Sequence, residues 1–448
     1  MNRRVKTFAA RQVIELLRSG VSSRYLGTLF SYGREAALER VVRELKQVSA
    51  EGGVVSLVVK GNFGNGKTHF LNLVFQKAAE MSFAISFVPL SRETPFHKLE
   101  RLYRRAVAGL TLPGYNQPGF APLLAGLKPG SAEADDILNY AGRNLHPKLA
   151  AVLRNYLEGN GDAYNQHILL SDLAGDFVPN AQLKSIHRLN FGKALALPRF
   201  SAKENTFDYF RFLARLICAR SYAGWVILFD EFEQLMYLGA QSRANAYLNA
   251  ARFISPAYGL TGVYSVFAAS SNLWSELIWK RKNSDFEIVP QKLTAKGREH
   301  DIPTVREVFT YFLKDSLFLD TLANFDIRRL LQAVRDHHAA AYGWPAPVDL
   351  DRFIDGLPLD RPLRTVIRAV VEYLDQQYLY DQRPEITVER PEEILPEEEA
   401  KEEGAEEEVA AAADEEENGA GDGRDEEERR SAGGAQEGGT FYEVAGDD

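Results

Sequence analysis

The chain has 448 residues, 45% of them hydrophobic, which is enough for two or three compact units with real cores. Its single cysteine, Cys218, excludes an internal disulfide, and no apolar run approaches the roughly 20 residues that span a bilayer. We therefore expect a protein of the reducing cytoplasm with no membrane association. The arginine-rich residues 1–20 lack the apolar core of a signal peptide and predict an amphipathic helix.

The formal net charge of −9 conceals two regions of opposite sign. Residues 391–448 hold 23 acidic and 4 basic residues, a net of −19, which leaves 39 acidic and 49 basic residues, a net of +10, in residues 1–390. The tail is rich in Glu, Ala, Gly and Asp and cannot bury enough apolar surface to fold, so we predict a disordered acidic tail over residues 383–448. The basic body permits binding to DNA, although an ordinary basic surface explains it equally well.

The first half of the chain predicts alternating helices and strands. Residues 1–49 read as helices, because Leu38, Val41 and Leu45 recur at helical spacing before "EGG". The apolar run 54–60 predicts a strand, and a helix from Lys67 to about Glu80 follows. A strand at 83–90 and a helix at 97–110 come next. This order predicts a parallel sheet with right-handed crossovers.

The second half predicts an insertion, two more strands and a helical region. Residues 112–205 are irregular and rich in helix-forming segments. Apolar runs starting at "WVILFDEFE" (225–233) and at 262–271 predict strands that are covered on both faces. Residues 302–380 predict helices.

The loop "GNFGNGKTHF" (61–70) lies between the first strand and its helix. It matches G-x-x-x-x-G-K-[ST] without a departure, and this pattern predicts binding of ATP and Mg²⁺. Glycines let backbone N–H groups surround phosphate oxygens, and the helix N-terminus attracts the same anion. We expect Lys67 to reach the β- and γ-phosphates and Thr68 to ligate Mg²⁺. The expected nucleotide-contacting residues are Gly61, Asn62, Phe63, Gly64, Asn65, Gly66, Lys67, Thr68 and His69. His69 is expected to be a surface residue rather than a catalyst.

An acid pair follows the apolar strand at 225–229. Asp230 is expected to hold Mg²⁺, mostly through water, and Glu231 to polarise the water that attacks the γ-phosphate. Kinases of small molecules with the same loop need no such glutamate, so the pair favours hydrolysis. Glu233 is expected to be a solvated loop acid and is the next candidate for the base.

Polar residues after the strand at 262–271 and in the helical region complete the predicted site. Among Ser270, Ser271 and Asn272, we select Asn272 as the side chain that contacts the γ-phosphate or the attacking water. Arg364, at the start of a late helix, is expected to reach the phosphates from a helical lid, with Arg368 as its competitor. The alternative explanation for Asn272 is that it caps a loop, and the alternative for Arg364 is a structural salt bridge.

Together these motifs resemble AAA+ ATPases of the origin-recognition type. The quoted loop and "VILFDEFE" carry the resemblance, with "YGREAALERVVREL" before them. More narrowly, "ARQVIELLRSGV", "SRETPFHKLERLYR", "HPKLAAVLRNYL" and "DHHAAAYGW" resemble the ATP-binding proteins of BREX-type bacterial phage defence. The resemblance spans about residues 8–380 and implies an ATPase of a multi-protein, DNA-directed defence system.

The resemblance implies an α/β fold of the P-loop NTPase, AAA+-like class. The predicted elements divide the chain into an N-terminal helical segment (1–49), an ATPase core with the helical insertion (50–300), a helical lid (301–382) and the acidic tail. Homo-oligomers are possible in such a family, yet the only candidates for an arginine finger are Arg281 and Arg298. The basic stretch 279–298 with Trp279 is the best candidate for contact with DNA phosphates, or else a solvated loop.

Two other functions stay open. A nucleotide-controlled scaffold or sensor with negligible turnover would use the same loop. A small-molecule kinase is disfavoured by the acid pair and by the large helical region.

Overall fold

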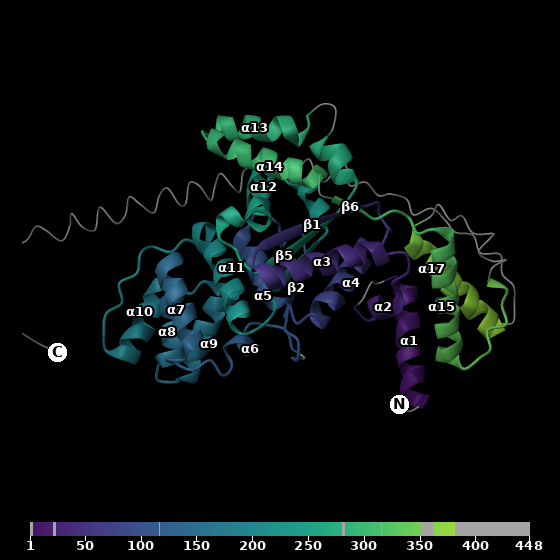
Figure 1. Ribbon diagram of the computed structural model, residues 1–448, viewed down its shortest axis with the longest axis horizontal. Helices are drawn as coiled ribbons and strands as arrows, with labels where there is room; N and C mark the ends of the chain where they lie inside the picture. Colours follow the sequence, from purple (N-terminus) through teal and green to yellow (C-terminus); the bar gives the residue numbers. More distant parts are fainter. Residues whose placement is uncertain are drawn as a thin grey trace, which may run out of the picture. The chain divides into compact units, whose positions relative to one another are not determined.

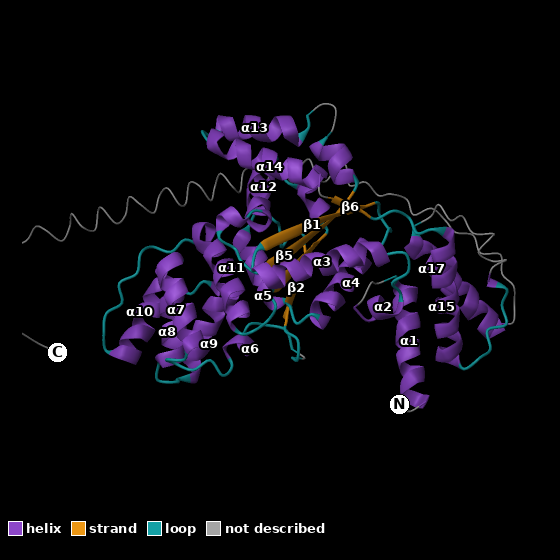
Figure 2. Cartoon of the chain, viewed as in Figure 1, coloured by secondary structure: helices purple, strands orange, loops and turns teal. Residues whose placement is uncertain are grey.

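The structure is a computed structural model that describes residues 3–20, 24–115, 117–279, 283–314, 316–350 and 362–380. These residues all fall within one compact unit. Its centre is a six-stranded sheet with the order β3-β2-β4-β5-β1-β6, drawn in orange in Figure 2. The strands are β1 (Val54–Gly61), β2 (Ala84–Pro89), β3 (Leu110–Thr111), β4 (Trp225–Asp230), β5 (Val263–Ser270) and β6 (Ser316–Phe318).

The sheet is parallel except where β3 pairs with β2. In the register of β1 and β5, Gly61 lies opposite Ser270, and Pro89 of β2 lies opposite Asp230 of β4. The carboxyl ends of these strands therefore meet at one edge, where parallel α/β sheets bind ligands. The predicted α/β fold with a mainly parallel sheet is confirmed.

Helices cover both faces of the sheet, which explains why the central strands are apolar throughout. Leu57 and Val59 of β1 face a core shared with α3 (Glu35–Glu51) and α4 (Lys67–Glu80). Val58 faces the opposite core. That second layer comprises α5 (Leu99–Ala108), α11 (Ala202–Ala219), α12 (Ala240–Ile254) and α14 (Ile302–Lys314). A strand that is buried on both faces cannot show alternating polarity.

A helical insertion separates β3 from β4 and packs on α5 and α11 (Figure 1). Its elements are α6 (Ala121–Leu124), α7 (Ala132–Asn144), α8 (Pro147–Glu158), α9 (Ala163–Ser171), η1 (Asp172–Asp176) and α10 (Asn180–Phe191). Lys148 and Asp172 form a fully buried ion pair at 2.6 Å within it. The hydroxyl of Tyr209 in α11 donates to the same carboxylate at 2.7 Å. This polar contact fixes the insertion to α11.

The segment 301–382, expected to be one helical lid, packs in two different places. Its first helix, α14, lies against α12 and α13 (Asp285–Ala295) on the sheet side, and β6 pairs with β1. The strand β6 escaped prediction because its three residues carry no detectable periodicity. The remaining helices, α15 (Asn324–Tyr342) and α17 (Leu363–Tyr380), pack elsewhere.

These two helices form a cluster with the N-terminal helices α1 (Arg3–Ser19) and α2 (Arg24–Leu29), and we call these four the helical cluster. Figure 1 shows α1 beside α15 and α17. Arg18 of α1 forms an ion pair with Asp375 of α17 at 2.9 Å, and His338 of α15 contacts the same carboxylate at 3.0 Å. The expected N-terminal segment 1–49 is thus divided, since α3 packs on the sheet.

Several predictions fall outside the described residues. They concern the acidic tail over 383–448 and the basic residues Lys280, Arg281 and Lys282. Within the described ranges, no helix combines the length and apolar character needed to span a bilayer.

Candidate functional site

The loop 61–68 connects the end of β1 to the start of α4 at the carboxyl edge of the sheet. Gly64 and Gly66 have φ angles of +80° and +84°, a region that other residues adopt only with strain. The Lys67 side chain is 8% exposed and its Nζ donates to the Gly61 carbonyl at 3.2 Å. The Lys67 side chain therefore folds back onto Gly61, the first residue of the loop. The helix α4 begins at Lys67.

The first acid of the predicted pair lies under this loop. Asp230 is 4% exposed and accepts a hydrogen bond from the Thr68 hydroxyl. Burial raises the pKa of Asp230 to about 6, while the Thr68 hydrogen bond acts in the opposite direction. The structure thus brings together the two residues that were predicted to hold a metal.

Two adjacent oxygen ligands suit Mg²⁺. This ion is commonly held in proteins by one or two carboxylates together with phosphate oxygens and waters. A divalent cation would add positive charge beside the buried Asp230 carboxylate, in addition to that of Lys67. The donor set of Thr68 and Asp230 therefore fits the predicted metal.

Glu231 lies where β4 ends and lines a pocket beside the loop. Its φ of +58° is unusual for a residue with a side chain, and its N–H donates to Asp230 Oδ1 at 3.0 Å. The exposed Glu231 side chain is at the pocket while Asp230 is beneath the loop. The tight turn thus gives two consecutive acids two separate positions.

Glu233 is not the solvated loop acid that was expected. Its side chain is 15% exposed and its Oε1 lies 3.7 Å from Lys67 Nζ. Burial raises the pKa of Glu233, whereas the charge of Lys67 lowers it. This contact could not be predicted from the sequence, because the turn after β4, η2 (Phe232–Tyr237), sets the direction of the side chain.

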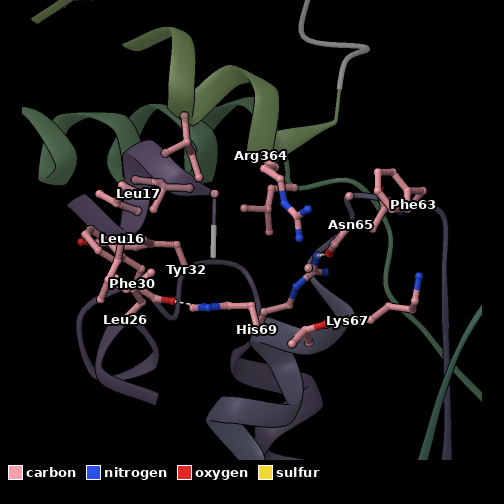
Figure 3. A pocket seen from close by; sticks show the side chains of 18 of the residues that line it. Leu16, Leu17, Leu26, Phe30, Tyr32, Phe63, Asn65, Lys67, His69 and Arg364 are labelled. Carbon is pink, nitrogen blue, oxygen red and sulfur yellow. Dashed lines mark hydrogen bonds between the residues drawn. The ribbon is translucent and has the colours of Figure 1, made fainter. Parts of the chain in front are cut away.

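A pocket of about 160 Å³ extends from the loop to the helical cluster (Figure 3). One wall contains loop residues from Phe63 to His69 together with Glu231 and Glu233. The opposite wall is mostly apolar, and its side chains come from α1, α2, α15 and α17. They are Leu16, Leu17, Leu26, Leu330 and Ile367, and Phe30, directly after α2, lies beside them. The pocket therefore combines a polar end with an apolar end.

His69 and Arg34 connect the loop to residues that precede it in the chain. His69 is only partly exposed and its ring contacts the Phe30 carbonyl, so the expectation of a surface residue is wrong. Burial lowers the pKa of His69. Arg34 donates to the carbonyls of Asn65 and Asp320 at 3.0 and 2.9 Å. Arg34 was not among the predicted site residues, although it lies in the segment "YGREAALERVVREL".

The start of α17 touches the loop. A Cβ on Gly64 would lie 2.5 Å from Pro362, and the guanidinium of Arg364 lies 5.9 Å from the centre of the Phe63 ring. Figure 3 shows Arg364 reaching into the pocket between the loop and the apolar wall. Arg368, its competitor, does not line the pocket among the described residues. The structure thus brings the first of the two arginines to the site.

Asn272 is not brought into the pocket within the described part of the chain. It is exposed at the start of η4 (Leu273–Ile278), and its N–H faces Ser270 Oγ at 3.4 Å. The preceding residues lie closer to the loop, because the Ser271 N–H donates to the Gly61 carbonyl at 3.3 Å. The end of β5 therefore contacts the loop through the backbone of Ser271 and not through the side chain of Asn272.

The described residues of the basic stretch, 279 and 283–298, do not line this pocket. Trp279 stacks on Phe286 with ring centres 5.4 Å apart, and Lys292 and Lys296 are exposed. Arg298, one of the arginine-finger candidates, is held by Asp301 and Asn245 within the chain.

Comparison with known families gives one match that includes the site. The model of the family described as "BREX system ATP-binding protein BrxC/D" matches residues 5–124 and 132–271, more than half of the chain. The matched regions contain the loop, Asp230, Glu231 and Glu233. No curated protein matches the chain. The sequence resemblance and the loop geometry agree with the family match: the chain belongs to the BrxC/D family of BREX system ATP-binding proteins.

Proposed function

We propose that this protein hydrolyses ATP with Mg²⁺ and uses the reaction within a multi-protein, DNA-directed phage-defence system. The observation that carries the proposal is the contact of the Thr68 hydroxyl with Asp230 beneath the loop, next to Glu231 in the pocket. A binding loop alone needs only phosphate contacts. A metal-ligand pair followed by a second, accessible acid is the arrangement that hydrolysis requires.

Each residue of the site has a role in this proposal. Backbone N–H groups of residues 61–68 and the α4 N-terminus bind the phosphates, and Lys67 neutralises their charge. Thr68 and Asp230 hold Mg²⁺, which would orient the phosphates and offset their negative charge. Glu231 accepts a proton from the attacking water. Arg364 contacts the phosphates from α17, and Asn272 would approach only after a movement of the chain after β5.

The apolar wall of the pocket fits the base of the nucleotide. Its side chains come from α1, α2, α15 and α17, while the phosphate loop forms the other wall. An adenine ring needs apolar contacts over both faces, and apolar lining with a few polar groups is typical of such sites. We infer that ATP lies with its base toward Leu17 and Ile367 and its phosphates toward Lys67.

Participation in a larger assembly is supported by the family, whose description places its members in the BREX system. Contact with DNA is supported by the excess of basic residues in positions 1–390 and by the exposed Lys292 and Lys296 of the basic stretch. A homo-oligomer that shares sites between subunits is a further possibility of this class of ATPase.

A nucleotide-controlled switch with negligible turnover is the second candidate. It is favoured by the contacts of the loop with α17, at Gly64–Pro362 and Phe63–Arg364. Phosphates entering the loop would compete for Arg364, and this competition would shift the start of α17. ATP binding alone could then change the helical cluster.

Phosphate release by the purified full-length chain separates the two candidates. Steady release with Mg²⁺ that is lost in Glu231→Gln supports the ATPase. Tight ATP binding with no release, both alone and with double-stranded DNA added, supports the switch. Sizing of the same samples reports whether ATP or DNA changes the oligomeric state.

A further inference from the structure

The Glu233 carboxylate lies beside the phosphate-binding lysine without a role in the proposed reaction. It follows Asp230 by three residues on η2, and its Oε1 lies 3.7 Å from Lys67 Nζ. The other oxygen, Oε2, is buried and has no hydrogen-bond partner in the described structure. Glu233 also lines the pocket, so a carboxylate with one unpartnered oxygen is next to the space that phosphates would enter.

The same carboxylate is close to the end of β5. The backbone N–H of Ser270 hydrogen-bonds to it, and Ser270 lies opposite Gly61 in the sheet register. Glu233 is therefore placed between the loop lysine and the backbone of the neighbouring strand. Both partners are positive or partly positive, as a buried carboxylate requires.

We propose that Glu233 is an internal counter-ion of Lys67 that holds the loop lysine while the loop is free of phosphate and competes with the β- and γ-phosphates for it. The inference rests on the proposed binding of nucleotide phosphates by this loop. Glu233 is a positioning residue, since it acts on the nucleotide through Lys67.

Charge repulsion explains why Lys67 does not keep its contact with Glu233 while it binds a phosphate. A phosphate at Lys67 would place its negative charge within a few ångströms of the Glu233 carboxylate, in a region where little water screens them. Like charges this close raise the cost of binding, so Lys67 exchanges one anionic partner for another. When phosphates arrive, the carboxylate keeps its contact with the Ser270 N–H and gives up Lys67. The contact with Ser270 then links the occupancy of the loop to the end of β5.

This role predicts a gain in affinity when the charge is removed. In Glu233→Gln the side chain keeps its shape and can still accept from the Ser270 N–H, but Lys67 has no competing anion. We expect ADP and a non-hydrolysable ATP analogue to bind about three- to thirtyfold more tightly than to the wild type, the range for losing a partly buried competing charge. AMP lacks the phosphates that reach Lys67, so its affinity should stay the same.

The experiment is isothermal calorimetry on the full-length chain with Mg²⁺ and each of the three nucleotides. Glu276→Gln is the matched control, because it removes one negative charge from an exposed position on η4. It should bind all three as the wild type does. Glu233→Asp keeps the charge but withdraws it by one methylene, so it should show a smaller gain than Glu233→Gln.

Wild-type or weaker binding of ADP and of the ATP analogue by Glu233→Gln would overturn the inference, as would an equal gain for AMP. If Glu233→Gln does not fold, wild-type or weaker binding by Glu233→Asp has the same meaning. Failure of the proposed nucleotide site gives a different result, namely no binding by the wild type. Because the analogue is not hydrolysed, the measurement does not depend on turnover.

Discussion

The two walls of the pocket are built in opposite ways. The phosphate wall consists mainly of one short loop between adjacent elements, β1 and α4, together with Glu231 and Glu233. The apolar wall is assembled from side chains of α1, α2, α15 and α17, whose residues lie up to about 350 positions apart. The first wall depends on local sequence, whereas the second depends on how the helical cluster packs.

We expect the two walls to have different roles: the phosphate wall in nucleotide binding and chemistry, and the apolar wall in coupling the site to the helical cluster. The phosphate wall is anchored to the sheet, because Asn65 Nδ2 donates to the Leu319 carbonyl at 2.9 Å and Arg34 holds the Asn65 carbonyl. The apolar wall belongs to the helical cluster, which contacts the loop through Pro362 and Arg364 and, at His69, through the Phe30 carbonyl. Changes in the phosphate wall should therefore affect affinity and chemistry, and changes in the helical cluster should affect stability and coupling.

The largest effect is expected from Lys67→Ala. Without this side chain the loop loses its charge at the β- and γ-phosphates, so ATP affinity should fall by about a thousandfold, within the range for truncating one partner of a close charge pair. Calorimetry measures it. Lys77→Ala, on the exposed end of the same helix, should bind ATP as the wild type does. Unchanged affinity in Lys67→Ala would show that the phosphates bind elsewhere.

Glu231→Gln tests the chemistry of the same wall. Turnover should fall by about a hundredfold or more, because loss of a general base costs a factor of this order. Binding of ATP should stay close to the wild type, since Thr68, Asp230 and Lys67 are intact. Phosphate release and calorimetry on one preparation give both values. Wild-type turnover would identify Glu231 as dispensable.

Asp375→Asn tests the helical cluster without touching the phosphate wall. Burial raises the pKa of Asp375, but hydrogen bonds from His338 and Arg18 outweigh it and lower the pKa overall. A lowered pKa stabilises the fold above the unfolded value of about 3.9, and this contribution disappears as the pH falls through the lower folded value. The variant should lose about 1–3 kcal/mol of stability at pH 7.

Denaturant unfolding measures this loss, and repeating it at decreasing pH tests the sign. The difference between variant and wild type should shrink as the pH falls below about 4. A difference that grows at low pH would contradict the assigned ion pair. ATP affinity of the folded variant, measured at neutral pH, should change less than in Lys67→Ala.

Arg364→Ala should have the smallest effect of this set. Arg364 is exposed and its guanidinium reaches the loop from α17, so its loss should weaken ATP binding by about three- to tenfold without unfolding the chain. Arg368→Ala, one helical turn further on, is the matched control and should bind as the wild type does. Equal effects of the two variants would show that general positive charge, and not the contact at the loop, is responsible.

The loop and the acid pair of the phosphate wall could be predicted because these features are local. The apolar strands, the glycine pattern and the position of Asp230 and Glu231 follow from short segments with known geometry. The β6 strand was missed because three residues carry no period. The contacts of Glu233, His69 and Arg34 depend on turns and on tertiary packing, which cannot be predicted from residue types and their spacing alone.

The helical cluster could not be predicted for a related reason. Amphipathic patterns show that α1, α15 and α17 each bury one face, but they do not show which faces meet. The pairing of Arg18 with Asp375 joins residues 357 positions apart. The boundary expected at residue 49 reflects composition, whereas the packing places α1 with α15 and α17 and leaves α3 on the sheet.

The pairing of α1 with α15 and α17 has a consequence during synthesis. A ribosome releases α1 first, but Leu16 and Leu17 meet Leu330 and Ile367 only after nearly the whole described chain has emerged. Until then α1 has an apolar face without its partners, because folding of such distant contacts waits for the later segment. The phosphate loop, the strands beside it and the carbonyls that hold Asn65 and Arg34 are complete by residue 320. A nascent chain of that length would therefore carry a finished phosphate loop and an unfinished pocket for the base.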